Sequence, residues 1–129
     1  MGTQAEHAHI IETINFLIQR YPKAFSLDRS GIRPLKDGIL DDLVADLGSE
    51  AFRPPMRRAL AYYKTRLHYL RKVISGKNYR DLHGNRCGLV EPEAKERAAK
   101  VRDEIIAKLR ADRVQAEMAE VWQHCHEDG

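Results

Sequence analysis

Residues 51–80 read AFRPPMRRALAYYKTRLHYLRKVISGKNYR and contain nine Lys or Arg, one His and no acidic residue. The whole chain of 129 residues has 22 Lys and Arg and 19 Asp and Glu. The segments on either side of this basic stretch therefore hold 13 bases and all 19 acids, and their charges sum to −6. Such segregation concentrates a positive potential on one region of the protein, as binding of a polyanion requires.

The basic stretch has the pattern of an amphipathic helix over residues 53–72. Pro54 and Pro55 suit the first turn of a helix, where a missing N–H group has no partner inside the helix. Apolar residues recur at helical spacing and predict the buried face. This face consists of Met56, Leu60, Tyr63, Leu67 and Leu70. Two further faces hold Arg57, Lys64, His68 and Arg71 on one side and Arg58, Tyr62, Arg66 and Tyr69 on the other.

Tyrosines are interleaved with these bases, at Tyr62, Tyr63, Tyr69 and Tyr79. Aromatic rings stack on unpaired nucleotide bases, and phenolic hydroxyls form hydrogen bonds with phosphates. Lys and Arg give affinity for the phosphate backbone of any nucleic acid, whereas the tyrosines favour RNA. The predicted partner is therefore a nucleic acid, and RNA in preference to DNA.

The flanking sequence predicts a mainly α-helical domain with a small β-hairpin and a long C-terminal helix. Apolar residues at helical spacing indicate three further helices, and the later turns of the last one extend past the core. The Gly84–Asn85 pair tolerates positive φ and favours a hairpin. We expect helices over 6–20, about 35–47 and 92–122, with the hairpin over 77–90.

The length suits one domain with a single core, which we expect over residues 10–125 between flexible ends, 1–9 and 126–129. A composition of 43% hydrophobic and 32% charged residues argues against a membrane protein, and the charged N-terminus does not resemble a signal peptide. Two cysteines are too few for a disulfide scaffold. These features predict a cytoplasmic protein.

The sequence shows no pattern of a metal site or of an enzyme. His124, Cys125 and His126 are adjacent, which is a poor spacing for a closed tetrahedral zinc site, and Cys87 is expected to pack within the hairpin. No nucleophile with a base, pair of carboxylates or phosphate-binding glycine loop is recognisable. We predict a protein that is not an enzyme and that uses no cofactor, metal or small-molecule substrate.

Four blocks occur in the chain in this order: YPKAFS at 21–26, RPLKDGILDDL at 33–43, MRRALAYYKTRLHYL at 56–70 and RDLHGNRCG at 80–88. Together they resemble the ProQ/FinO family of bacterial RNA-binding proteins, over roughly residues 10–107. The resemblance implies a compact helical domain with a basic concave face. It also implies RNA chaperones that regulate small RNAs and messages after transcription, and that recognise intrinsic-terminator hairpins with a single-stranded 3′ uridine tail.

The resemblance also carries individual roles onto this chain. The RPLK motif supplies Arg33 and Lys36 as phosphate ligands, and Tyr69 takes the position of a tyrosine that orients the RNA tail by stacking or through its hydroxyl. The start of the 53–72 helix would add its positive dipole end toward the terminal nucleotide. The complete set of expected RNA-binding residues is Arg33, Lys36, Arg53, Arg57, Arg58, Lys64, Tyr69, Lys72, Lys77 and Arg80.

Arg80 departs from the family pattern. Family hairpins often carry a base two positions before the Asp of the DL dipeptide, and that position is Tyr79 here. Neighbouring side chains on a strand point to opposite faces, so Arg80 is not expected simply to inherit the contact. Longer members also carry basic extensions, of which this sequence shows almost none, so RNA binding is a firmer expectation than RNA annealing.

Two other classes of protein fit parts of the sequence. A helical DNA-binding transcriptional regulator would insert the 53–72 helix into a major groove. A protein-interaction domain would use the long C-terminal helix, for example in a homodimer, but the charges of this helix are mixed and no sustained heptad repeat is evident. We therefore expect a monomer.

Overall fold

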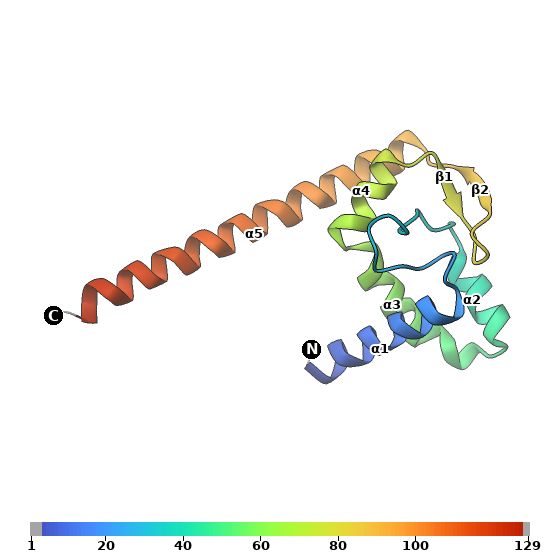
Figure 1. Cartoon of the computed structure of the whole chain (residues 1–129), viewed down its shortest axis with the longest axis horizontal. Helices are drawn as coiled ribbons and strands as arrows, with labels where there is room; N and C mark the ends of the chain where they lie inside the picture. The colour runs from blue at the N-terminus through green and yellow to red at the C-terminus, as the bar shows by residue number, and fades with distance from the viewer. Residues whose placement is uncertain (1–3, 128–129) are drawn as a thin grey trace.

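The computed structural model describes residues 4–127, with side chains described as far as Gln123, and shows a helical body from which one long helix projects (Figure 1). The predicted fold class is confirmed. Within the described residues, no helix is both long enough and apolar enough to cross a membrane. The elements are α1 (Gln4–Arg20), α2 (Ile39–Leu47), the short 3₁₀ helix η1 (Glu50–Phe52), α3 (Arg53–Lys64), α4 (Leu67–Ser75), β1 (Asn78–Arg80), β2 (Arg86–Leu89) and α5 (Pro92–Glu127).

The first and last helices are longer than the sequence predicted. Helix α1 begins at Gln4, so residues 4–9, expected to be flexible, form its first turns. Helix α5 continues to Glu127, beyond the expected end at residue 122. Residues 1–3 and 128–129, which belong to the two predicted flexible ends, lie outside the described residues. The domain bounds of 10–125 stay a prediction.

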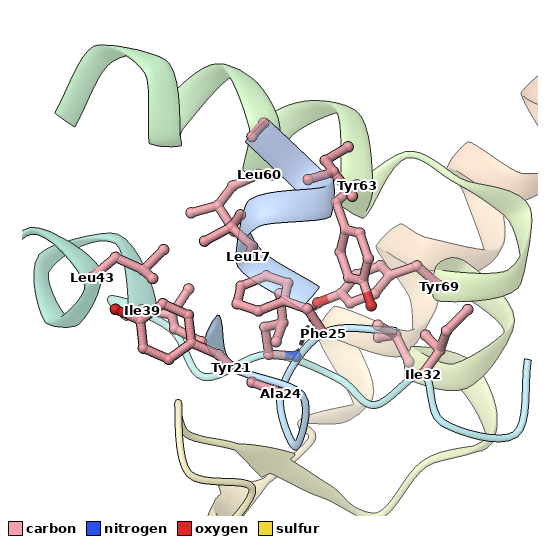
Figure 2. Close-up of a cluster of buried hydrophobic side chains, with 14 of the residues drawn as sticks. Leu17, Tyr21, Ala24, Phe25, Ile32, Ile39, Leu43, Leu60, Tyr63 and Tyr69 are labelled. Atoms are coloured by element: carbon pink, nitrogen blue, oxygen red, sulfur yellow. Dashed lines mark hydrogen bonds between the residues drawn. The ribbon is translucent and has the colours of Figure 1, made fainter. Parts of the chain in front are cut away.

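The core lies where α1, α2, α3 and α4 meet the connector that follows α1 (Figure 2). Phe25 of this connector is almost completely buried and packs its ring edge against Tyr63, with 5.4 Å between the ring centroids. The Tyr63 hydroxyl donates to the Ser26 carbonyl oxygen at 3.0 Å and accepts from the Ser26 N–H at 3.1 Å. These contacts hold the connector against α3. The buried side chains that Figure 2 labels are Leu17, Tyr21, Ala24, Phe25, Ile32, Ile39, Leu43, Leu60, Tyr63 and Tyr69.

The basic stretch forms two helices, so the prediction of one continuous 53–72 helix is wrong. Helix α3 ends at Lys64, because the N–H and the hydroxyl of Thr65 both donate to the Tyr62 carbonyl oxygen, at 3.2 and 2.9 Å. Arg66 then adopts an extended backbone, and α4 starts in a new direction. This change turns Tyr69 into the core, where it is 6% exposed. The expectation that Tyr69 lies on a face with Arg58 and Tyr62 is therefore also wrong.

The second helix starts later than predicted because the residues before it pair with the hairpin. The Lys36 N–H donates to the Arg80 carbonyl oxygen, and the Arg80 N–H donates to the Pro34 carbonyl oxygen, both at 2.8 Å. This parallel bridge centres on Leu35. Gly38, at a φ of 85°, then leads the chain into α2. The RPLK motif is therefore attached to β1 rather than to a helix.

Strands β1 and β2 form the predicted antiparallel hairpin. The Asp81 carboxylate closes its turn by accepting from two backbone N–H groups at 2.9 and 3.0 Å. Gly84 is required in this turn, since its φ is 81° and a Cβ there would lie 2.8 Å from the Cβ of Lys23. Cys87 is exposed and not packed as expected.

Helix α4 packs against the first turns of α5. Ala94 and Ala98 are buried there, and Val101 and Ile105 are partly buried. All side chains described from Ala107 onward are exposed, and this half of α5 projects away from the body (Figure 1). The predicted extension of the last helix past the core is confirmed.

Candidate nucleic-acid interface

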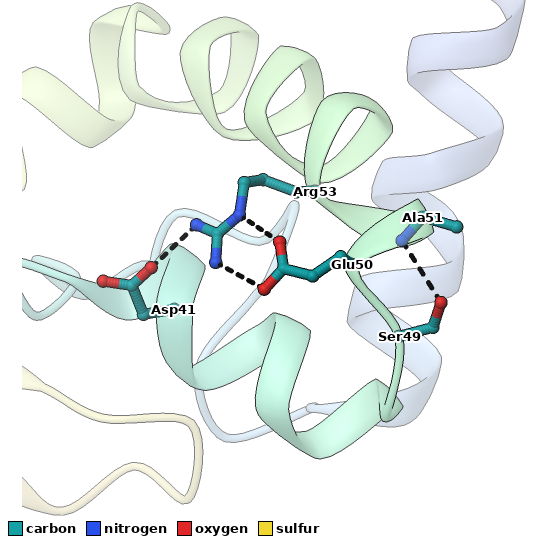
Figure 3. A network of polar contacts seen from close by, with 5 residues as sticks. All are labelled: Asp41, Ser49, Glu50, Ala51 and Arg53. Atoms are coloured by element: carbon teal, nitrogen blue, oxygen red, sulfur yellow. Dashed lines mark hydrogen bonds and ion pairs between the residues drawn. The ribbon is translucent and has the colours of Figure 1, made fainter.

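Two of the predicted phosphate ligands are already paired with carboxylates. Arg53 donates from Nη1 to Asp41 Oδ1 at 2.7 Å, and from Nε and Nη2 to the two oxygens of Glu50 at 2.8 and 3.1 Å (Figure 3). The ammonium of Lys36 lies 2.7 Å from Asp42 Oδ2. The consecutive acids in the first turn of α2 therefore each hold one predicted RNA ligand. We refer to Lys36, Asp41, Asp42, Glu50 and Arg53 as the acid-paired corner.

The pairing keeps these bases charged but offsets their charge. The hydrogen bonds that Arg53 donates to Glu50 and then to Asp41 raise the pKa of Arg53, and the hydrogen bond that Lys36 donates to Asp42 raises the pKa of Lys36. The same contact with Arg53 lowers the pKa of Glu50. Because these pairs are open to solvent, salt screens them and an incoming anion can compete for the bases. A phosphate at this corner has to displace a carboxylate.

The N-terminus of α3 has few N–H groups to offer an anion. Pro54 and Pro55 have none, and the N–H of Arg53 already donates to the Glu50 carbonyl oxygen. The helix dipole remains, but the Glu50 carboxylate lies beside it through its bonds to Arg53. The predicted role of this helix end in holding the terminal nucleotide is therefore limited to the dipole.

The other bases of the basic stretch have no ion pair. Within residues 51–80, all of which the structure describes, Arg53 is the one base that pairs with an acid. The guanidinium of Arg66 instead lies over the Tyr62 ring, 4.2 Å from its centroid. The remaining predicted ligands that lack a carboxylate partner in the described part of the chain are Arg33, Arg57, Arg58, Lys64, Lys72, Lys77 and Arg80.

A cavity of about 440 Å³ lies between α4, α5, the RPLK motif and β1. We call it the α4–α5 cavity. It brings together two predicted ligands from the basic stretch, Lys64 and Tyr69. Its other walls contribute both charge and apolar surface. These additional lining residues are Leu35, Asp37, Leu70, Val73, Tyr79, Glu91, Arg97, Ala98 and Val101.

Burial shifts the pKa values of Lys64 and Tyr69. Loss of solvent lowers the pKa of the Lys64 ammonium, and the charge of Asp37 opposes this shift. Burial also raises the pKa of Tyr69 to about 12, so its hydroxyl is neutral at physiological pH. This hydroxyl accepts from the Leu35 N–H at 3.1 Å. The buried Tyr69 ring has no free face for stacking, so of its two expected roles only the one through the hydroxyl stays a prediction.

Tyr79 and Arg80 point to different places. The Tyr79 hydroxyl donates to Glu91 Oε2 at 3.0 Å and lines the α4–α5 cavity. Arg80 donates from Nη1 to the Gly84 carbonyl oxygen at 3.1 Å, across the hairpin turn. Arg80, the base of this dipeptide, therefore lies outside the α4–α5 cavity, whereas Tyr79 lines it.

Sequence reasoning missed Arg97 as a site residue. It comes from α5, far along the chain from the basic stretch, and lines the same cavity as Lys64. One signal was available, because Arg97 directly precedes Ala98, which lies with Val101 and Ile105 on one apolar stripe at helical spacing. A base that flanks a buried stripe lies at the edge of the packed surface, where a cavity can form.

The described side chains include no group of three or more His, Cys, Asp or Glu that could hold a metal ion. The run His124, Cys125, His126, weighed as a metal site from the sequence, lies outside the described side chains.

The fold and the site define a small helical domain with one hairpin, whose cations are concentrated in a single stretch and largely unpaired. The chain belongs to the ProQ/FinO family, since the family model for the ProQ/FINO family matches residues 7–116. It is similar to a ProQ homolog from Legionella pneumophila solved by NMR, with 31% identity and a TM-score of 0.60, over 74% of this chain and 81% of that one. A FinO-like RNA chaperone from Neisseria meningitidis MC58 shares the fold, with 23% identity and a TM-score of 0.61, over 77% of this chain and 80% of that one.

Proposed function

We propose that this chain binds structured RNA, including small RNAs and the 3′ ends of messages, and regulates gene expression after transcription in the cytoplasm. The observation that carries this function is the basic stretch, in which eight of nine bases have no ion pair among the described residues. Unpaired cations are the groups that phosphates recruit, because no internal carboxylate has to be displaced. Membership of the ProQ/FinO family and the fold shared with a FinO-like RNA chaperone support this function.

The preferred RNA is an intrinsic-terminator hairpin with a single-stranded 3′ uridine tail. An A-form stem hides the edges of its nucleobases in a deep groove. The exposed basic side chains, such as Arg57 and Arg58, therefore contact the phosphate backbone of the stem. The tail differs from the stem because it can enter a pocket. The α4–α5 cavity, at about 440 Å³, falls in the size range of about 300–1,000 Å³ that is typical of ligand pockets.

The cavity offers complementary groups for the end of such a tail. Lys64 and Arg97 provide charge for a phosphate, and the Tyr69 hydroxyl provides a neutral hydrogen-bonding group for a ribose oxygen. The protein has no need of a catalytic step for this role, so we propose a binding protein and not an enzyme. Binding would stabilise the RNA and promote RNA–RNA pairing. Each chain would bind RNA with its own basic stretch.

A binding competition at one fixed, near-physiological salt concentration tests this function. The three competitors are a terminator hairpin with a free 3′ uridine tail, the same hairpin without its tail, and duplex DNA of the same stem sequence. We expect a strong preference for the tailed RNA. Equal binding to all three would reduce the site to a nonspecific basic surface.

A preference for duplex DNA would instead support a DNA-binding regulator. The structure disfavours that alternative, because the helix that would enter the major groove is interrupted at Thr65 and Arg66. Its second half also turns Tyr69 and Leu70 into the core.

A further inference from the structure

Helix α5 carries two apolar stripes on different sides. The first consists of Ala94, Ala98, Val101 and Ile105 and packs on the body. The second lies on the projecting half and consists of Ala107, Ala111, Val114, Met118 and Val121. At 3.6 residues per turn, the two stripes are centred roughly 150° apart around the helix. Because the apolar residues change side partway along α5, no single apolar face is evident when the whole helix is considered.

The second stripe has the spacing of a coiled coil. Its residues follow one another at intervals of four, three, four and three, which is the heptad pattern of positions a and d. Val114, Met118 and Val121 are 56%, 65% and 60% exposed. In proteins, most of the stability of a helix comes from packing of its apolar face. The projecting half of α5 is therefore suited to pack against another helix.

We propose that the second stripe binds the same stripe of a second copy of this chain, with the two helices antiparallel. Positions a are Ala111 and Met118, and positions d are Ala107, Val114 and Val121. An antiparallel pair places each a residue opposite a d residue of the other copy. Ala107 then meets Met118, and Ala111 meets Val114, so a small side chain faces a larger one in each of these layers, and Val121 lies beyond them.

Charges beside the stripe favour the same arrangement. Arg110 and Glu117 occupy successive g positions, and antiparallel helices bring g positions together across the interface. Each Arg110 therefore meets Glu117 of the other copy, and the pairing occurs twice. A parallel pair would place Arg110 opposite Gln115 and Glu117 opposite Trp122, so neither ion pair would form.

The interface is short and includes two alanines on each helix, so we expect a weak dimer that forms as concentration rises. This dimer replaces the sequence-based expectation of a monomer. It is independent of the proposed RNA binding, because the stripe lies outside residues 51–80 and the α4–α5 cavity. Each copy keeps its own basic stretch.

Sedimentation equilibrium of the full chain over a range of concentrations tests association. We expect the parent to shift from monomer to dimer, and Met118→Lys to stay monomeric. Ala116→Lys is the matched control, because it adds the same charge on the face of the helix opposite the seam and should dimerise like the parent. Circular dichroism verifies that both variants stay helical. A parent that remains monomeric throughout, or equal effects of the two substitutions, would overturn the proposal.

Charge reversal tests the antiparallel arrangement. Arg110→Glu and Glu117→Arg should each weaken the dimer, because each creates two like-charge contacts, and the double variant should restore it. Failure of the double variant to restore association would overturn the antiparallel pairing.

Discussion

Basic side chains have different surroundings in the acid-paired corner and in the α4–α5 cavity. In the corner, Arg53 and Lys36 are half-buried, and each lies 2.7 Å from a carboxylate of α2. In the cavity, Lys64 has no ion pair among the described residues, and burial lowers the pKa of its ammonium. A phosphate gains less at the corner, where it must replace a carboxylate, than at the cavity, where it would supply a missing partner. A count of Lys and Arg in the sequence therefore overestimates the attraction of phosphate to the acid-paired corner. It underestimates the attraction of phosphate to the α4–α5 cavity.

The largest effect is expected from removing Tyr69 from the wall of the cavity. Tyr69→Ala should lower the free energy of unfolding by about 3–5 kcal/mol, because it deletes a buried aromatic ring. Tyr69→Phe keeps the ring and should lose about 1–2 kcal/mol, since the buried Leu35 N–H loses its acceptor. Urea unfolding measures both. Tyr62→Ala, at a half-buried position, is the control, and equal losses for Tyr69→Ala and Tyr62→Ala would contradict the burial of Tyr69.

The ionisation of Tyr69 predicts a loss of stability in alkali. Its pKa is about 12 in the folded chain and 10.0 for an unperturbed tyrosine, so the folded state holds the proton more tightly. The stability that this provides is complete below about pH 10 and falls as the pH rises from about 10 to 12. Urea unfolding across this range should show a steeper decline for the parent than for Tyr69→Phe. Parallel declines would show that Tyr69 keeps its ordinary pKa.

Loss of an unpaired base should weaken RNA binding more than loss of a paired one. Lys64→Met and Arg57→Ala should each cost about 1–3 kcal/mol of binding free energy, since each removes a charge-assisted hydrogen bond to a phosphate. Arg53→Ala should cost less, because RNA can use Arg53 only by displacing Glu50 and Asp41. Titration of the tailed terminator hairpin measures the three variants. An Arg53→Ala variant that binds worse than the other two would reverse the ranking of the two regions.

The smallest effect should come from the acids of the corner, and it should be an increase. Asp41→Asn and Asp42→Asn remove carboxylates that compete with phosphate for Arg53 and Lys36. We expect affinity for the tailed hairpin to rise about two- to five-fold, which is the range of an exposed ion pair. Asp103→Asn on α5 removes the same charge away from the corner and controls for the change in net charge. Unchanged or lower affinity in the corner variants would show that the acids position the bases rather than compete for them.

The elements that depend on local pattern were predictable from the sequence. Apolar spacing predicted α1, α2 and α5, and the Gly84–Asn85 pair predicted the hairpin. The interruption at Thr65 was not predictable, because the apolar spacing continues from Tyr63 to Leu67 without a break. Only tertiary packing selects the Thr65 hydroxyl as a cap. The burial of Tyr69 follows from that interruption.

The candidate site was predictable in its residue types but not in its pairings. The cluster of bases in residues 51–80 is visible in the sequence, as are the acids that flank it. The capture of Arg53 by Asp41 spans twelve residues and depends on how α2 approaches α3. Arg97 joins the cavity only because α5 packs on α4, which is a non-local contact. Periodicity describes one element at a time and does not contain this information.

The parallel bridge between the RPLK motif and β1 has a consequence for local opening of the chain. The N–H groups of Lys36 and Arg80 are protected by the same bridge, and the Leu35 N–H by the Tyr69 hydroxyl. Fraying of the hairpin alone does not expose these amides to solvent. The motif must also separate from β1 or α4 before they can exchange. Amide hydrogen exchange at the three positions should therefore follow one shared opening event, which makes the motif, the hairpin and α4 a single cooperative unit.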